Sequence, residues 1–281
     1  MEKQTVIIAI TADLDYSGLV RHVANEVFEH AHFSKAWCGR LKLVVDELFM
    51  NACRYGSIKG KSVVHLAFEY DDQGMRFTIE DDGTGPQAKS AEELKAVIQK
   101  NAASMDVTRT SGRGLALISK MWTDGMVVEK SQHGGILISF VKRLENAESP
   151  PLMAPMALEV ITPEPLQVTV TPVPPPPTAK ATPVVKGPVV EIKLSGEIDQ
   201  SNLAERIAPI ASQVEIMPNG GILALDFSEL IYINSTFIGA MAGWYRSLLE
   251  KGGTIRIIKP SPQIKEILSL VGLLNVLEIQ E

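Results

Sequence analysis

The sequence predicts an α/β protein of two domains joined by a proline-rich linker. The chain has 281 residues, of which 45% are apolar and 21% charged, which is typical of globular proteins and sufficient for two domains. The composition changes abruptly between Asn146 and Pro188, where most of the 17 prolines lie. So much proline prevents strand pairing and burial of a core. We therefore expect domains at residues 1–145 and 188–281, with a linker at residues 146–187.

The segment from Val44 to Gly56 predicts a helix with one polar face. Its apolar residues follow a helical period, and Glu47 and Asn51 lie one turn apart on the opposite face. A carboxylate and a carboxamide on a core-facing helix need partners, because burying them alone is costly. Magnesium with nucleotide phosphates is one ligand that satisfies both, and an ordinary amphipathic helix is the alternative.

Two later segments accompany this helix. Ile79 to Gly85 ends a strand-like run (Met75 to Glu80) with an acid and two spaced glycines, which alone is compatible with a hairpin turn. Thr110 to Ile118 is a glycine-flanked loop that enters an apolar helix, which alone is an ordinary helix start. In this order the three segments resemble the N, G1 and G2 boxes of the ATP-binding superfamily that unites gyrase, histidine kinases, mismatch-repair ATPases and heat-shock chaperones.

The resemblance covers roughly residues 5–143 and implies an α/β sandwich with a mixed sheet and helices on one face. It implies that Asn51 ligates Mg²⁺ and that Glu47 orients or deprotonates the attacking hydroxyl as a general base. Asp81 would accept a hydrogen bond from the exocyclic amine of adenine, and Gly83 would leave room for the base. The nucleotide-binding residues that it implies are Asn51, Asp81, Gly83, Gly85, Gly112, Arg113, Gly114 and Leu115.

In this resemblance the G2 box lies beside a lid that covers the phosphates. Gly112 and Gly114 allow the lid to fold, and N–H groups at the start of the Leu115 helix meet the negative charge. Arg113 is a candidate phosphate contact, with an exposed solubilising arginine as the alternative. The lid itself is expected at residues 86–109.

Within this superfamily the chain resembles the anti-sigma-factor serine kinases of bacterial sporulation and general-stress partner switches. About 40 residues precede the N-box helix, so we expect no dimerising helix with a phosphoacceptor histidine, as in a sensor histidine kinase. No large transducer domain follows, which disfavours gyrase-like or chaperone-like machines. The resemblance includes Ala12-Asp13-Leu14 and Leu19-Val20-Arg21 and implies a dimer through the kinase domain.

Residues 188–281 alternate predicted strands and helices and resemble a STAS domain, the fold of anti-sigma-factor antagonists and sulfate-transporter tails. The resemblance is carried by Gly196, Asp199, Asp226-Phe227-Ser228 and the loop at Ser235. An apolar run at 221–227 predicts a strand in a sheet covered on both faces. The other expected elements are strands at 189–194, 254–258 and 276–279, a turn at 196–199, and helices at 203–214, from the Ser235 loop to about residue 250, and at 263–271.

In the antagonists the loop before the central helix has the pattern Asp-Ser-Ser/Thr-Gly, and its first serine is phosphorylated by the cognate kinase. Ser235 matches that serine, and Thr236 is a secondary acceptor. Asn234 replaces the usual Asp and Phe237 the usual Gly, and both departures put the modification in question. The alternative is that Ser235 and Thr236 only satisfy N–H groups at the helix start.

Composition excludes several other classes. The chain has two cysteines, Cys38 and Cys53, and so few favour a protein of the reducing cytosol. The N-terminus lacks the pattern of a signal peptide. No apolar run approaches the roughly 20 residues needed to span a bilayer, so we expect a cytoplasmic protein. The formal charge is −6, and residues 146–281 hold 9 Lys or Arg against 14 Asp or Glu, a net −5, which argues against nucleic-acid binding.

Both kinds of domain in one chain favour partner switching as the function. An ATP- and Mg²⁺-dependent kinase would phosphorylate a STAS domain, its own or a partner's, to control binding of a sigma factor or another signalling protein. A flexible linker of this length has a root-mean-square reach of roughly 35 Å, which gives effective concentrations up to about millimolar. The alternative is a nucleotide-gated interaction module with a degenerate STAS domain and little catalytic activity.

Overall fold

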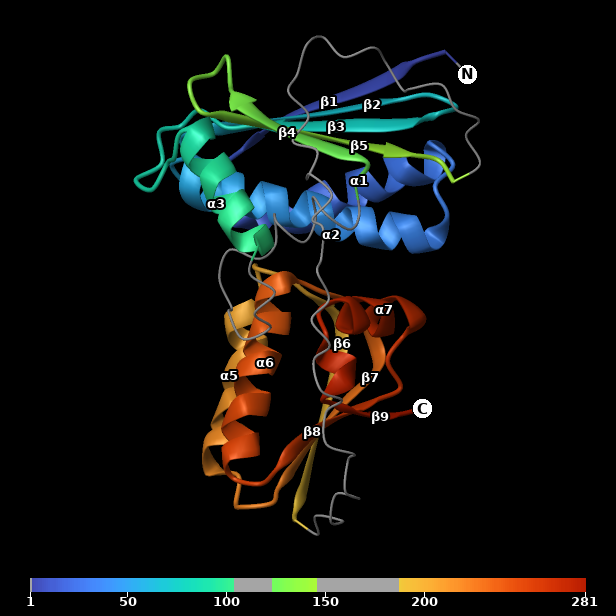
Figure 1. The fold of residues 1–281 in the computed structure, drawn as a ribbon, viewed down its shortest axis with the longest axis vertical. Coiled ribbons are helices and arrows are strands. Elements are labelled where there is room, and N and C mark those ends of the chain that lie inside the picture. Colours follow the sequence, from blue (N-terminus) through green and yellow to red (C-terminus); the bar gives the residue numbers. More distant parts are fainter. Residues whose placement is uncertain (1, 104–122, 146–186) are drawn as a thin grey trace, which may run out of the picture.

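The computed structural model describes residues 2–103, 123–145 and 187–281, which form two α/β parts, each built on its own sheet (Figure 1). This architecture confirms the expected fold class. Within these residues no helix is long and apolar enough to cross a membrane.

The N-terminal part is a five-stranded sheet with helices on one face (Figure 1). Alternate residues of its strands are buried against the helices, as for Val64, Leu66 and Phe68. A mixed sheet was expected, but every pairing among the described strands is antiparallel, in the order β1-β2-β3-β5-β4. The strands are β1 (Gln4–Thr11), β2 (Val63–Tyr70), β3 (Gly74–Glu80), β4 (Gly125–Lys130) and β5 (Ile136–Arg143).

Helices α1 (Ser17–His30) and α2 (Lys35–Asn51) lie between this sheet and the C-terminal part (Figure 1). Helix α2 begins where the Ser34 side chain accepts a hydrogen bond from the N–H of Trp37. After Asn51 it widens into a π-helical turn, η2 (Ala52–Gly56). Because its two faces pack against the sheet and the C-terminal part, α2 is buried along most of its length.

The segment expected to be the lid contains a helix, α3 (Ala91–Ala103). It begins with a capping box, in which the Ser90 hydroxyl accepts from the N–H of Glu93 and the Glu93 carboxylate accepts from the N–H of Ser90. The rest of the expected lid, from residue 104, lies outside the described residues, as do 110–118 of the G2 box.

The C-terminal part is a four-stranded parallel sheet in the order β6-β7-β8-β9. Its elements are β6 (Val189–Ile198), α5 (Leu203–Ile216), β7 (Ile222–Ile233), α6 (Ser235–Glu250), β8 (Thr254–Ile258), α7 (Pro262–Leu270) and β9 (Glu278–Gln280). The helices were expected within two residues of these bounds.

Two strand predictions were too short. The first strand continues to Ile198, because Gly196, with φ of 71°, lies at a shift of the β6–β7 register instead of forming a turn. Strand β7 likewise continues past Phe227 to Ile233, since the extension of β6 supplies pairing partners as far as that residue. These extensions carry the strand ends to the N-terminal part.

Candidate functional site at the junction of the two parts

Glu47 and Asn51 lie at the C-terminal end of α2, half-buried and one turn apart, as their spacing predicted. The Asn51 amide Nδ2 donates to Glu47 Oε1 over 3.4 Å. This bond directs the amide nitrogen toward Glu47, so the side-chain oxygen of Asn51 remains available as a ligand for a hard cation.

Asp81 lies just beyond the end of β3, and its side chain is buried. Its Oδ1 accepts hydrogen bonds from the backbone N–H groups of Gly83 (3.0 Å) and Ile136 (3.1 Å). Burial raises the pKa of this carboxyl above its ordinary value, although the two backbone bonds act in the opposite direction. Because both of these bonds end on Oδ1, Oδ2 is left to accept from a ligand donor such as an amine.

Close backbone approaches hold Asp81 in place. A Cβ on Gly56 would lie 2.1 Å from Asp81 Oδ2, and one on Gly135 would lie 1.9 Å from Oδ1. Gly83 has a φ of 68°, and a Cβ there would meet the Cα of Gly135 at 2.7 Å. At Gly85 a Cβ would lie 2.1 Å from the carbonyl oxygen of Tyr55, so the G1 turn packs directly on η2.

These contacts extend the role expected for the glycines. Gly83 and Gly85 are required by the packing of the turn itself, whether or not a base approaches it. Gly135 was not identified from the sequence, because Gly134-Gly135 before an apolar run resembles an ordinary hairpin. Gly112, Arg113, Gly114 and Leu115 lie outside the described residues, so their roles remain predictions.

Ser235 is the first residue of α6 and meets Glu47 across the junction. Its hydroxyl donates to Glu47 Oε2 over 2.5 Å. The N-cap of α6 is Asn234, whose side-chain oxygen accepts from the N–H of Phe237 over 2.9 Å. The helix start is therefore capped by the neighbouring residue, and the hydroxyl of Ser235 is directed at the carboxylate of the N-terminal part.

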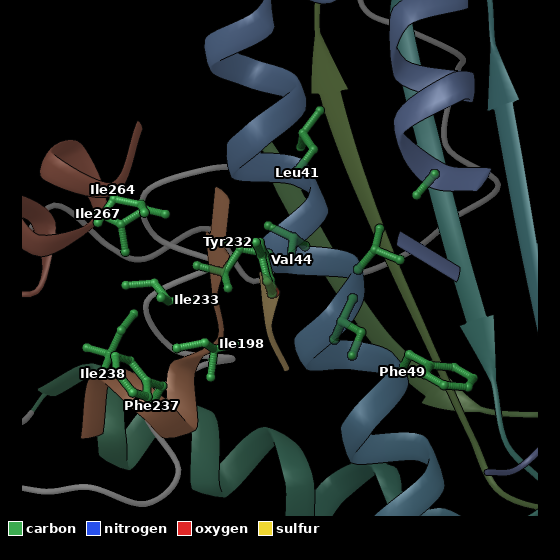
Figure 2. Packing of buried hydrophobic residues seen from close by; sticks show 14 of the residues in the cluster. Leu41, Val44, Phe49, Ile198, Tyr232, Ile233, Phe237, Ile238, Ile264 and Ile267 are labelled. Carbon is green, nitrogen blue, oxygen red and sulfur yellow. The ribbon is translucent and has the colours of Figure 1, made fainter. Parts of the chain in front are cut away.

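The second departure from the antagonist pattern is accommodated inside the C-terminal part. Phe237 is fully buried and stacks edge-to-face on Trp244, with ring centroids 5.8 Å apart. Figure 2 shows Phe237 and Ile238 within the apolar cluster of this part, whereas Tyr232 points toward α2. The bulky residue at the usual glycine position therefore leaves the Ser235 hydroxyl accessible to Glu47.

A buried charge cluster beside this contact joins α1, α2 and the C-terminal part. The Arg21 guanidinium of α1 donates to Asp46 over 2.8 Å, to Glu197 over 2.7 Å, and also to Asp199. The Tyr232 hydroxyl donates to Asp46 over 2.8 Å, and the Arg21 guanidinium lies 4.4 Å above the Tyr232 ring. Asp46 is 0% exposed, and Arg21 and Tyr232 are 2% exposed.

The electrostatics of this cluster depend on its burial. Burial raises the pKa of Tyr232 well above its ordinary value, and the Asp46 carboxylate adds to this effect. Burial also works to raise the pKa of Asp199, but hydrogen bonds from Arg21 and Ser201 outweigh it and the net shift is downward. The phenol and the Asp199 carboxylate are therefore held in the protonation states that their hydrogen bonds require.

Sequence reasoning identified only part of this junction. Asp199 and Arg21 belong to the segments that carry the family resemblances, whereas the sequence indicated no role for Asp46 and Tyr232. The available signal was Asp46, an acid among apolar residues on the buried side of a helix. A further contact from Arg54 of η2 to Gln200 had no sequence signal, because both residues are typical of exposed surfaces.

Comparisons with known proteins give matches for both parts of the chain. Residues 10–140 match the family model of the histidine kinase-like ATPase domain, and residues 184–278 match the model described as "Mlab, STAS domain". An anti-sigma-B factor antagonist of Bacillus subtilis is 24% identical over 93 residues, which cover 32% of this chain and 80% of the relative. One of Listeria monocytogenes is 26% identical over 91 residues, covering 32% and 78%.

A solved structure of the anti-sigma factor antagonist SpoIIAA in its unphosphorylated form also matches, with a TM-score of 0.30 and 22% identity, covering 34% of this chain and 84% of that chain. The two family matches confirm both resemblances expected from the sequence motifs. The chain therefore joins a histidine kinase-like ATPase domain to a STAS domain that is similar to anti-sigma factor antagonists.

Proposed function

We propose that this protein is an ATP-dependent serine kinase of the anti-sigma-factor type that phosphorylates Ser235 of its own STAS domain. The observation that carries the proposal is the hydrogen bond from the Ser235 hydroxyl to Glu47, 2.5 Å long. A general base must lie within hydrogen-bond reach of the proton that it removes. Here that reach is made across the junction of the two domains.

The residues present fit the nucleotide that the ATPase fold implies. The lack of a Cβ at Gly56 lets Asp81 Oδ2 lie close against η2, and this oxygen would accept from the adenine amine. Glu47 and Asn51 supply oxygen atoms of the type that Mg²⁺ prefers, and Asn51 would hold the ion. Bound Mg²⁺ would neutralise phosphate charge.

The transfer balances with the groups on either side of the junction. Ser235 Oγ forms a bond to the γ-phosphorus of ATP as its proton passes to Glu47. The bond between the γ-phosphorus and the bridging oxygen breaks, and ADP leaves. The product is a phosphoserine next to Glu47 and near Asp46, and its charge of about −2 opposes continued docking.

Release of the STAS domain is the proposed switch. The released surface of α1 and α2 would bind a sigma factor or another signalling protein, and dephosphorylation would restore docking. Tethering by the linker favours docking within one chain, since the effective concentration reaches about millimolar. Transfer to a partner's STAS domain and dimerisation through the ATPase domain remain expectations from the resemblance.

The test is incubation of the full chain with labelled ATP and Mg²⁺, followed by mapping of the phosphorylated residue. We expect phosphate on Ser235, a rate independent of protein concentration, and retention of label in the control Thr236→Ala. Glu47→Gln should lower the rate by roughly 10²–10⁴ while ATP still binds. If residues 188–281 carry no phosphate under any condition, the chain is instead a nucleotide-gated interaction module.

Ser235→Asp provides a second test. One carboxylate carries less charge than a phosphate, so this variant should weaken docking only in part. Ser235→Ala loses the hydrogen bond to Glu47 but should remain able to dock, and it should not be released by ATP. Docking of the Asp variant with the affinity of the wild type would favour the interaction-module alternative.

A further inference from the structure

The two domains also touch at a second place on α2, around Gly39. Eight residues separate Gly39 from Glu47, so at ~1.5 Å for each residue the two contacts lie about 12 Å apart along the helix. There the first turn of α7 lies on the N-terminal half of α2. A Cβ on Gly39 would lie 2.2 Å from Nε2 and 2.4 Å from Cδ of Gln263. Next to it, the Arg40 guanidinium forms an ion pair with Glu266.

Gly39 is unusual because it lies in the interior of a helix. Glycine weakens a helix interior relative to alanine, and its use there requires a backbone or packing reason. Its backbone is that of the surrounding helix, so no left-handed conformation explains it. The close neighbour at this position is Gln263 of the other domain, whose side chain would have to turn away from α2 if position 39 carried a Cβ.

Contacts within each domain orient the two sides of this contact. The Arg40 guanidinium stacks 4.4 Å from the Trp37 ring centroid, and the Lys142 ammonium lies 4.0 Å from the same ring centroid. On the other side, Ser261 caps α7 by accepting from the N–H of Ile264, and Pro262 occupies the first turn. Gln263 is therefore presented from a fixed helix start.

We propose that Gly39 and Arg40 are specificity-determining residues that select this chain's own STAS domain through Gln263 and Glu266. This inference rests on the proposed function in one respect: the selected docking serves to bring Ser235 to Glu47. The contact itself contains neither catalytic nor nucleotide-binding residues. The contact favours a STAS domain that has a side chain able to pack over Gly39 and an acidic residue opposite Arg40. It disfavours STAS domains that place a lysine or arginine opposite Arg40.

The experiment measures docking in the full chain without nucleotide, as the radius of gyration in small-angle X-ray scattering at several concentrations. Gly39→Leu and Arg40→Glu should each expand the chain, by about 5 Å or more for a linker with a reach of roughly 35 Å. The paired variants Gly39→Leu with Gln263→Ala, and Arg40→Glu with Glu266→Arg, should return most of the way to the wild-type value.

Matched controls separate the contact from general damage. Gly243→Leu changes another helical glycine, in α6, where a Cβ would meet no atom within 4 Å, and it should stay compact. Lys193→Glu breaks the exposed ion pair with Glu229 and should also stay compact. Expansion of either control to the same extent would overturn the inference, as would compact Gly39→Leu and Arg40→Glu chains or paired variants as expanded as the single ones.

Phosphate on Ser235, measured in the same variants, distinguishes this inference from the proposed function. A wild type that is compact but never phosphorylated would refute the kinase assignment and leave the selective contact in place. Phosphorylation of Gly39→Leu and Arg40→Glu at the wild-type rate would refute the selective contact and leave the kinase in place.

Discussion

Replacing Tyr232 with Phe tests whether the buried charge cluster holds the STAS domain on the ATPase domain. The change removes the hydroxyl that donates to Asp46 over 2.8 Å and keeps the ring on which Arg21 stacks. A hydrogen bond to a charged group contributes about 1.5–3 kcal/mol, and full burial of Asp46 places this one toward the upper end. Since 1.4 kcal/mol is tenfold in affinity, docking should weaken by about 10- to 150-fold.

A double-mutant cycle isolates this bond from other effects of the substitutions. Separated domains, 1–145 and 188–281, would be checked for folding by circular dichroism and titrated against each other by calorimetry. The cycle combines Tyr232→Phe with Asp46→Ala, and the coupling energy should be about 1.5–3 kcal/mol. Tyr245→Phe, on α6, is the control and should leave docking within a factor of about two.

The reasoning would be refuted by a coupling energy below about 0.5 kcal/mol, which is the scatter expected for independent sites. It would also be refuted if Tyr232→Phe docked as tightly as the wild type while Ser235 still met Glu47. The cluster would then be a consequence of docking by other contacts, with no net contribution of its own.

Three further predictions concern the ATPase domain. Asp81→Asn places an amide where the adenine amine must be accepted, so ATP affinity and the preference over GTP should both fall in calorimetry. Gly135→Ala places a Cβ 1.9 Å from Asp81 Oδ1 and should lower both thermal stability and ATP binding, whereas Gly125→Ala, where a Cβ meets no atom within 4 Å, should change neither. Burial raises the pKa of Cys38 from 9.0 to about 11 and that of Cys53 from 9.0 to about 12. At pH 8 the native thiols should therefore react with a disulfide reagent at least ~100-fold more slowly than the thiols of the protein unfolded in urea. The free energy of unfolding should decline as pH rises above about 9, because only the unfolded thiols ionise there. Rapid labelling of the native protein would contradict this prediction.

The local elements could be predicted because their signals lie within short stretches of chain. The apolar period of α2 determined its polar face, and the spacing of Glu47 and Asn51 placed them one turn apart. Asparagine is among the residues that cap helices, and the structure places Asn234 as the N-cap of α6. Strand ends were less accurate, because the extension of β6 beyond Gly196 depends on pairing with a distant strand.

The sequence by itself predicted two domains, their order and candidate residues for nucleotide binding, since motif spacing and periodicity are local properties. Only the tertiary structure decided that Ser235 meets Glu47, that Arg21 is shared by acids of both domains, and that Gly39 makes room for Gln263. Each of these contacts joins residues more than 150 positions apart or closes a charge cluster between them. Removing charged and polar groups from water is costly, and the cost is offset only where their partners meet in the folded structure, which no local pattern in the chain records.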